Sequence, residues 1–125
     1  MIVIDAGAAI AASLGQVDEN ISLRDELAAP HLIDSEVLNG LRNLVLRAAI
    51  TAEDGERAVS IFAQIEIERY PAAWLRKRIW ELRHCLTAYD ATYVALTERL
   101  DADRLLTTDA RLSRAPGIRC SVAVV

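Results

Sequence analysis

The chain has 125 residues, of which 53% are apolar and 26% are charged, and its formal net charge at pH 7 is −4. This length suits one compact domain over residues 1–125, and we expect no second one. No apolar run approaches the ~18 residues of a membrane-spanning helix, and the negative charge argues against a protein that wraps nucleic acid through bulk electrostatics.

The N-terminal segment predicts a strand followed by a helix. It begins directly with MIVID and lacks the basic stretch and cleavable apolar segment of a secretory signal, so we expect a cytoplasmic protein with no membrane contact. MIVI is a short apolar run that ends at Asp5. The following AGAAIAASLG consists largely of helix-forming alanines and closes with Gly15, a suitable C-cap.

The middle of the chain predicts two strands with two paired helices between them. LAAPHLI predicts a brief strand after Pro30, and SEVLNGLRNLVLRAAI carries an apolar stripe at helical spacing. TAEDGERAVSIFAQI opens with Thr51 and Asp54 at capping-box spacing and predicts a helix that pairs with the preceding one. IEIERYP alternates apolar and charged residues up to Pro71, a pattern typical of an edge strand.

The last third predicts two helices and two strands. Leucines and an isoleucine repeat at helical spacing from Leu75 to Leu86, and a further helix is expected from about Thr87 to Leu100. RLLTT predicts a strand, DARLSRA a helical turn or two, and IRCSVAVV a final strand. Strands that alternate with helices predict an α/β fold: a mostly parallel sheet of four to five short strands with helices on both faces.

Four acidic residues occupy positions where such a sheet binds ligands. Asp5 and Asp109 follow predicted strands, and Glu36 and Asp90 lie in the first turns of helices. Because ligands bind outside the carboxyl ends of parallel strands, all four side chains are expected at one edge. Each also has a structural explanation, either as a helix cap or through the helix dipole.

Capping does not explain the apolar surroundings of Asp90, which shares a helix face with Tyr93, Val94 and Thr97. A bare carboxylate on a partly buried face costs on the order of several kcal/mol unless it is neutralised, paired or bound to metal. Clustered carboxylates without histidine or thiolate form a hard oxygen site, suited to Mg²⁺ or Mn²⁺. Hydrolysis of a phosphodiester is the reaction that such a site serves best.

Three segments carry a family resemblance: VIDAGAAI, SEVLNGLR and YDATYVALTERLDADRLLTTDARLSRA. In this order they make the chain similar to PIN-domain ribonucleases, and specifically to the VapC-like toxins of bacterial type II toxin–antitoxin pairs. The resemblance implies that Mg²⁺ or Mn²⁺ binds at the catalytic acids Asp5, Glu36, Asp90 and Asp109. It also implies cleavage of structured RNA (tRNA or rRNA) that inhibits translation, a VapB-like antitoxin that covers the site, and a homodimer.

Beside the acids, the same resemblance draws attention to nearby polar residues. The family often has Ser, Thr or Asn two residues after the first Asp, where this chain has Gly7, so a hydrogen bond to the metal ligands is either missing or supplied by Thr107 or Thr108. Asn39 also recurs in the family's pattern. It either orients a ligand or is an ordinary solvent-facing helix residue.

Basic residues gather in the segment WLRKRIWELRH, for which a solvated helix face is the simplest explanation. Arg83 in this segment either contacts an RNA phosphate or forms an exposed salt bridge. Trp80 either offers a base a stacking surface or packs in the core or an interface.

Other phosphate-handling folds fit poorly. A receiver domain requires a Lys near the end of its fifth strand, and the only Lys is Lys77; a haloacid-dehalogenase-like phosphatase requires Asp-x-Asp, and Asp5 is followed by Ala6 and Gly7. The Gly-rich turn of a nucleotide binder is missing. Two alternatives to a toxin stay open: a PIN-fold module that binds RNA or protein without cleaving, and a housekeeping RNA-processing nuclease.

Overall fold

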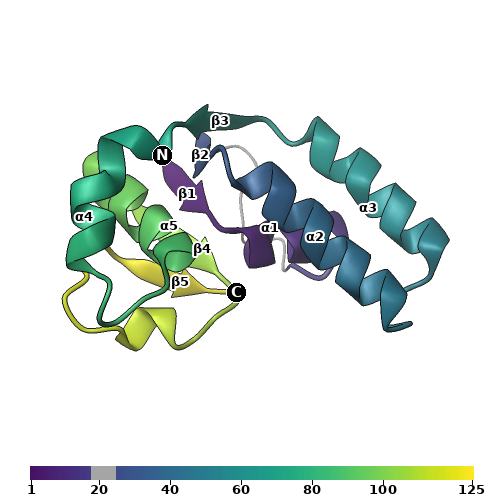
Figure 1. Cartoon of the computed structure of the whole chain (residues 1–125). Coiled ribbons are helices and arrows are strands. Elements are labelled where there is room, and N and C mark those ends of the chain that lie inside the picture. The colour runs from purple at the N-terminus through teal and green to yellow at the C-terminus, as the bar shows by residue number, and fades with distance from the viewer. Residues whose placement is uncertain (18–24) are drawn as a thin grey trace.

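The computed structural model describes residues 1–17 and 25–125 (Figure 1). In chain order the elements are β1 (Ile2–Ile4), α1 (Ala6–Ser13), β2 (Leu27–Pro30), α2 (Ile33–Leu46), α3 (Ala52–Gln64), β3 (Ile67–Tyr70), the 3-10 turn η1 (Ala72–Leu75), α4 (Arg76–Glu81), α5 (Ala88–Arg99), β4 (Arg104–Thr107), the 3-10 turn η2 (Leu112–Arg114) and β5 (Val122–Val124). The five strands form one parallel sheet in the order β3-β2-β1-β4-β5. The predicted parallel α/β fold is confirmed.

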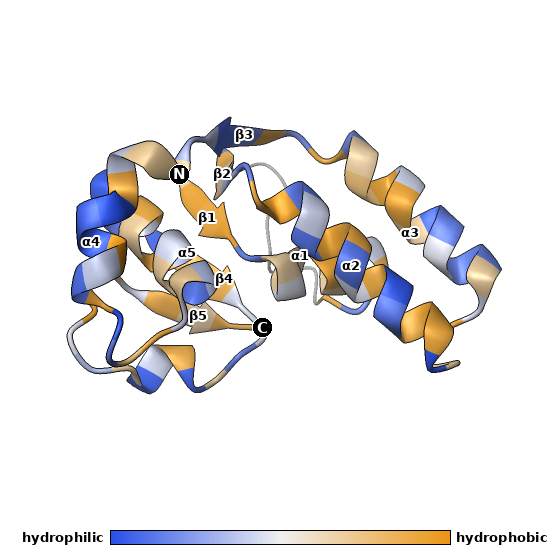
Figure 2. Ribbon diagram, in the orientation of Figure 1, coloured by the Kyte–Doolittle hydropathy of each residue, from blue (hydrophilic) through white to orange (hydrophobic). Residues whose placement is uncertain are grey.

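Helices cover both faces of the sheet, because successive strand residues point to opposite sides. Ile2 and Ile4 pack with buried residues of α1, α2 and α3, whereas Val3 packs with buried residues of α5 and with Leu75 and Leu82, which flank α4. β1 is buried on both faces and is apolar at every position, which is why it is orange along its length in Figure 2. No helix in the described part of the chain is long and apolar enough to cross a membrane.

Two local predictions need correction. The second strand does not follow Pro30 but ends with it, and Pro30 lies opposite Tyr70 in the sheet. A terminal strand position suits a proline, and the next N–H, that of His31, donates to the Tyr70 carbonyl at 3.0 Å. Leu38 belongs to the apolar stripe predicted for α2, but its side chain is 48% exposed. The helix buries a narrower face, made of Ile33, Val37 and Leu41.

Helix α5 is the most enclosed helix of the fold. All seven residues from Ala91 to Thr97 are buried. Its two buried threonines satisfy their hydroxyls within the helix: Thr92 donates to the Ala88 carbonyl at 2.6 Å and Thr97 to the Tyr93 carbonyl at 2.8 Å. The position of α5 is therefore fixed on every side.

Candidate active site

The strand order places a crevice between β1 and β4. β2 and β3 lie on one side of β1 in the sheet, and β4 and β5 lie on the other side. The strand order therefore reverses between β1 and β4. Ligands of open α/β sheets bind at such a point, beyond the carboxyl ends of the strands. Asp5 follows β1 there, and its N–H donates to the Leu106 carbonyl of β4 at 3.0 Å.

Asp5 is both a cap and a member of an acidic cluster. Its Oδ1 accepts the Ala8 N–H at 2.8 Å and so caps α1, as the structural explanation requires. Burial nevertheless raises the pKa of Asp5, with added repulsion from Asp90 and Asp109, and the Thr107 hydroxyl and the Ala8 N–H offset only part of this. Capping alone therefore leaves the carboxylate incompletely stabilised.

Glu36 reaches the same crevice from α2. The Tyr93 hydroxyl of α5 donates to Glu36 Oε1 at 2.8 Å. Burial raises the pKa of Glu36, the Tyr93 hydrogen bond opposes this, and the charges of Asp90 and Asp5 raise it further. Burial also raises the pKa of Tyr93, with Glu36 adding to it, so Tyr93 stays a donor. Tyr93 thereby holds the glutamate at the crevice wall.

Asp90 stands in the first turn of α5. Its N–H donates to the Thr87 hydroxyl at 3.2 Å, which is half of a capping box. Burial raises the pKa of Asp90 and repulsion from Asp109 adds to it, while Arg111 and Thr87 lower it. Asp5, Glu36 and Asp90 thus form a partly buried group of mutually repelling carboxylates.

Asp109 differs from the other three acids. Its carboxylate accepts three hydrogen bonds from Arg111: the backbone N–H at 2.9 Å, Nε at 3.1 Å and Nη2 at 2.9 Å. The Arg111 side chain holds the pKa of Asp109 below its ordinary value. Within residues 1–17 and 25–125, no three His, Cys, Asp or Glu side chains are arranged as a metal site.

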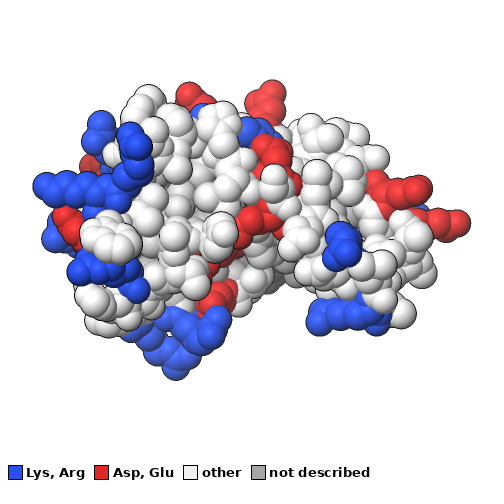
Figure 3. All heavy atoms as spheres, in the orientation of Figure 1, with Lys and Arg blue, Asp and Glu red and all other residues white. Residues whose placement is uncertain are grey.

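A cleft of about 390 Å³ opens beside Asp90 and Asp109, and Cys85, Arg111 and Arg114 form part of its walls. Figure 3 shows acidic residues across the middle of this face of the molecule and basic residues toward both ends. A larger hollow, about 910 Å³, lies along β3 and α3 and is lined by residues at the amino ends of the strands, away from this crevice.

The two threonines predicted to assist the acids lie at the crevice. Buried Thr107 accepts the Asp109 N–H at 3.0 Å and favours the charged form of Asp5. The Thr108 hydroxyl fills the space where a side chain on Gly7 would begin, so a Cβ there would collide with it. Thr108, the residue after β4, therefore fills the volume that a side chain at position 7 would occupy.

Among the described residues, no hydrogen bond or ion pair joins Asn39 or Arg83 to the four acids, although Asn39 lies one helical turn after Glu36. Asn39 is exposed on α2, and Arg83 is stacked on Trp80 beyond the end of α4. Sequence reasoning missed Tyr93 and Arg111 as parts of the site. Their spacing was available as a signal: Tyr93 is one helical turn from Asp90, and Arg111 is two residues from Asp109.

The donor set fits a hard divalent cation. The four acids offer only carboxylate oxygens, and the raised pKa values of Asp5, Glu36 and Asp90 mean that their negative charge lacks full compensation. A bound cation would supply that compensation. To join such a site, Asp109 would first have to leave Arg111, and the other carboxylates would have to move closer together, since no three of them are arranged as a metal site in the described residues.

Three comparisons with known proteins agree with this geometry. The family model described as "PIN domain" matches residues 2–118. The chain is 46% identical over 127 residues to Ribonuclease VapC9 of Mycobacterium tuberculosis, covering 100% of this chain and 98% of that protein. Among solved structures, PAE2754 from Pyrobaculum aerophilum superposes with a TM-score of 0.69 at 25% identity, covering 90% and 84% of the two chains. VapBC2 from Rickettsia felis, bound to a promoter DNA fragment, superposes with a TM-score of 0.70 at 16% identity, covering 99% and 98%.

Proposed function

Because the chain belongs to the PIN-domain family, as a ribonuclease of the VapC type, we propose that it is the toxin of a toxin–antitoxin pair and hydrolyses phosphodiester bonds in structured RNA. We place the reaction at Asp5, Glu36, Asp90 and Asp109, within one domain of residues 1–125. The observation that carries this proposal is the convergence of these carboxylates, three of them with raised pKa values, at the reversal of strand order.

Each acid has a part in the proposed chemistry. Asp5, Glu36, Asp90 and Asp109 would hold Mg²⁺ or Mn²⁺, which would neutralise the phosphate and activate a water molecule. Asp90 and Asp109 lie in the wall of the cleft, where they meet the substrate. Arg111 and Arg114 line the same cleft and bind phosphate oxygens of the RNA.

The substrate and partners follow from the same assignment. We propose tRNA or rRNA as the target, inhibition of translation as the outcome, and a VapB-like antitoxin as the partner that covers the cleft. We also propose a homodimer. Leu38 and Leu46 on α2, which are 48% and 67% exposed, supply apolar surface for a protein partner of either kind.

A second candidate, an RNA-binding module without cleavage, is favoured by one observation. The Asp109 carboxylate is fully engaged by Arg111, which leaves it unavailable as a ligand in this conformation. If that pair persisted in the presence of metal, the acids would bind no ion productively.

Cleavage of a purified pool of tRNA and rRNA tests the assignment. Wild-type protein, Asp90→Asn and a matched control, Asp101→Asn, are compared with Mg²⁺, with Mn²⁺ and with a chelator. Asp101 is exposed and has a φ of 49°, which asparagine also tolerates, so its substitution changes charge without disturbing the crevice. We expect discrete fragments from the wild type and Asp101→Asn only, and none with chelator.

Fragments that persist in chelator would rule out the metal-dependent mechanism, and fragments from Asp90→Asn would remove Asp90 from the site. If folded wild-type protein produces none with either metal, the binding-module alternative replaces the nuclease. Cleavage without growth arrest when the protein is expressed alone would indicate a housekeeping nuclease instead of a toxin.

A further inference from the structure

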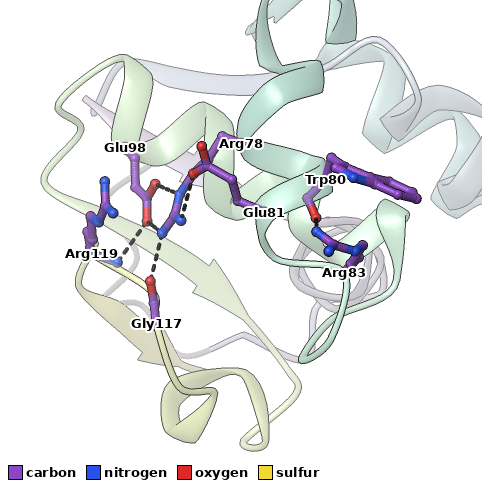
Figure 4. Close-up of polar contacts among 7 residues, drawn as sticks. All are labelled: Arg78, Trp80, Glu81, Arg83, Glu98, Gly117 and Arg119. Carbon is purple, nitrogen blue, oxygen red and sulfur yellow. Dashed lines mark hydrogen bonds and ion pairs between the residues drawn. The ribbon is translucent and has the colours of Figure 1, made fainter.

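An exposed tryptophan stands at the end of α4. Trp80 is 68% exposed, and the guanidinium of Arg83 lies over its ring, 4.7 Å from the centroid. Arg83 Nη1 also donates to the Trp80 carbonyl at 2.9 Å (Figure 4). The hydrogen bond fixes the arginine against the indole, so the two side chains form one rigid unit, which we call the Trp80–Arg83 pair.

The charge of Arg83 is uncompensated, unlike that of its neighbour Arg78. Arg78 is held by Glu98 through Nε at 2.7 Å and Nη2 at 3.1 Å, by Glu81 at 3.3 Å and by the Gly117 carbonyl at 2.7 Å, as Figure 4 shows. In the described ranges no carboxylate lies within ion-pair distance of Arg83. Arg78 therefore stabilises the fold, while Arg83 is free to meet an anion.

The Trp80–Arg83 pair leads directly into the cleft that holds Asp90 and Asp109. Cys85, two residues after Arg83, lines that cleft. Trp80 is five residues from Cys85, which limits the distance between their Cα atoms to at most ~18 Å even for an extended chain. A strand of RNA with one phosphate at the cleft thus reaches the pair within a few nucleotides.

We propose that the Trp80–Arg83 pair is a docking surface for an unpaired segment of RNA beside the cleft. A base stacks on the exposed indole and the guanidinium of Arg83 contacts a neighbouring phosphate. Aromatic rings beside arginine are how proteins bind single-stranded nucleic acid, because every base has a face to stack and every nucleotide a phosphate. This inference rests on the proposed function, since it takes RNA as the ligand.

An RNA partner fits this surface better than a protein partner. An exposed tryptophan alone would suit either one. The unpaired charge of Arg83, however, calls for an anion, and the segment that carries the pair runs at Cys85 into the wall of a cleft proposed to hold a phosphodiester. A protein partner is an outcome that the experiment distinguishes.

Tryptophan fluorescence reports on the pair directly, because the chain has two tryptophans. Trp74→Phe leaves Trp80 as the sole emitter, and Trp80→Phe leaves Trp74, which is 58% exposed on the neighbouring turn η1. Both are made in the Asp90→Asn background and titrated with single-stranded oligoadenosine in Mg²⁺, so that the RNA stays intact. We expect RNA to quench the first variant and leave the second unchanged.

Binding constants supply the second readout. Trp80→Ala should weaken oligoadenosine binding about tenfold or more, the loss of one stacked base. Arg83→Gln should weaken it and reduce the salt slope by about one. Trp74→Ala and Arg76→Gln, exposed residues at the other end of the same segment, are the matched controls and should bind like the parent.

The outcomes separate this inference from the proposed function. Unchanged binding by Trp80→Ala and Arg83→Gln, while the wild type cleaves RNA, overturns the docking surface and leaves the nuclease intact. Quenching of Trp80 by RNA in a protein that never cleaves supports the docking surface and overturns the nuclease. A Trp80 signal that changes with protein concentration alone, together with a doubled mass in sedimentation, makes this surface a dimer interface and overturns the inference.

Discussion

The Arg111 guanidinium donates hydrogen bonds to both oxygens of the Asp109 carboxylate, from Nε to Oδ1 at 3.1 Å and from Nη2 to Oδ2 at 2.9 Å. A cation of the protein itself thus occupies the ligand face of one acid, while Asp5, Glu36 and Asp90 repel one another without such a partner. A divalent ion that uses Asp109 must displace this guanidinium. If the proposed function holds, metal binding and the release of Arg111 toward RNA are coupled.

Removing Arg111 should tighten metal binding. Exposed ion pairs are weak and Arg111 is 86% exposed, so Arg111→Gln should lower the dissociation constant for Mn²⁺ by only roughly two- to fivefold. Calorimetric titration of the RNA-free protein measures this. Arg114 lies in the same cleft wall and forms no ion pair with any residue that the structure describes, so Arg114→Gln is the control. Identical affinities for wild type and Arg111→Gln would show that Asp109 does not serve as a ligand.

The metal-free protein should be more stable in mild acid than at neutral pH. A carboxyl whose pKa is raised on folding, as in Asp5, Glu36 and Asp90, binds its proton more tightly in the folded state. Its destabilising effect is complete above the folded pKa and disappears as pH falls toward the ordinary values of 3.8 for Asp and 4.5 for Glu. Denaturant unfolding in chelator, measured from neutral pH down toward these ordinary values, should show this gain.

Saturating Mn²⁺ should reverse that dependence, because the ion competes with protons for the same oxygens. Glu36→Gln should reduce the acid-induced gain in chelator. A stability in chelator that only falls between pH 7 and pH 5 would contradict the raised pKa values.

The ion pair of Arg78 and Glu98 should be a main stabilising contact between α4, α5 and the segment before β5. Burial alone would raise the pKa of Glu98, but hydrogen bonds from Arg78 and from the Arg119 N–H outweigh it and hold the pKa below its ordinary value. Its stabilising effect is therefore present above the ordinary value of 4.5 and is lost as pH falls through the lower folded pKa.

Glu98→Gln should cost roughly 1.5–3 kcal/mol at neutral pH, the range for hydrogen bonds to charged groups. Urea unfolding measures the loss. Glu81→Gln, whose side chain is 43% exposed and contacts Arg78 at 3.3 Å, should cost under about 0.5 kcal/mol. Equal losses in the two variants would refute the special role of Glu98.

Gly7 and Thr108 should behave as a compensating pair. A Cβ at position 7 meets the Thr108 hydroxyl, so Gly7→Ala should cost about 1–3 kcal/mol through overpacking. Thr108→Ala removes that oxygen and leaves a Cβ 3.6 Å away, an ordinary contact, so the double variant should regain most of the loss. A double-mutant cycle by thermal unfolding gives the coupling energy. Additive effects would mean that the crevice relaxes elsewhere.

The sequence predicted the architecture well because hydrophobic periodicity and caps are local signals. The Thr51 and Asp54 capping box of α3 and the positive φ of Gly15 after α1 appear where their patterns placed them. The alternation of strands and helices likewise placed Asp5 and Asp109 at the carboxyl ends of neighbouring strands. Pro30 misled because a proline is compatible with either end of a short strand.

The contacts within the crevice were beyond such signals. Tyr93 and Glu36 are 57 residues apart, and no local pattern indicates that their side chains meet. The choice of Arg111 as the partner of Asp109 depends on a rotamer, which residue spacing does not fix. Arg83 was left between a phosphate contact and a salt bridge, and its stacking on Trp80 was not among the options considered.

Because α5 is enclosed by the rest of the protein, the residues around the cleft differ in how well they tolerate substitution. Asp90 lies in the first turn of α5, and the next seven residues of the helix are buried, so its carboxylate is anchored by the interior of the protein. Arg83, Arg111 and Arg114 instead belong to exposed connections around the same cleft. Engineering of new RNA preferences can therefore exchange these connections while the acid-bearing frame is left untouched.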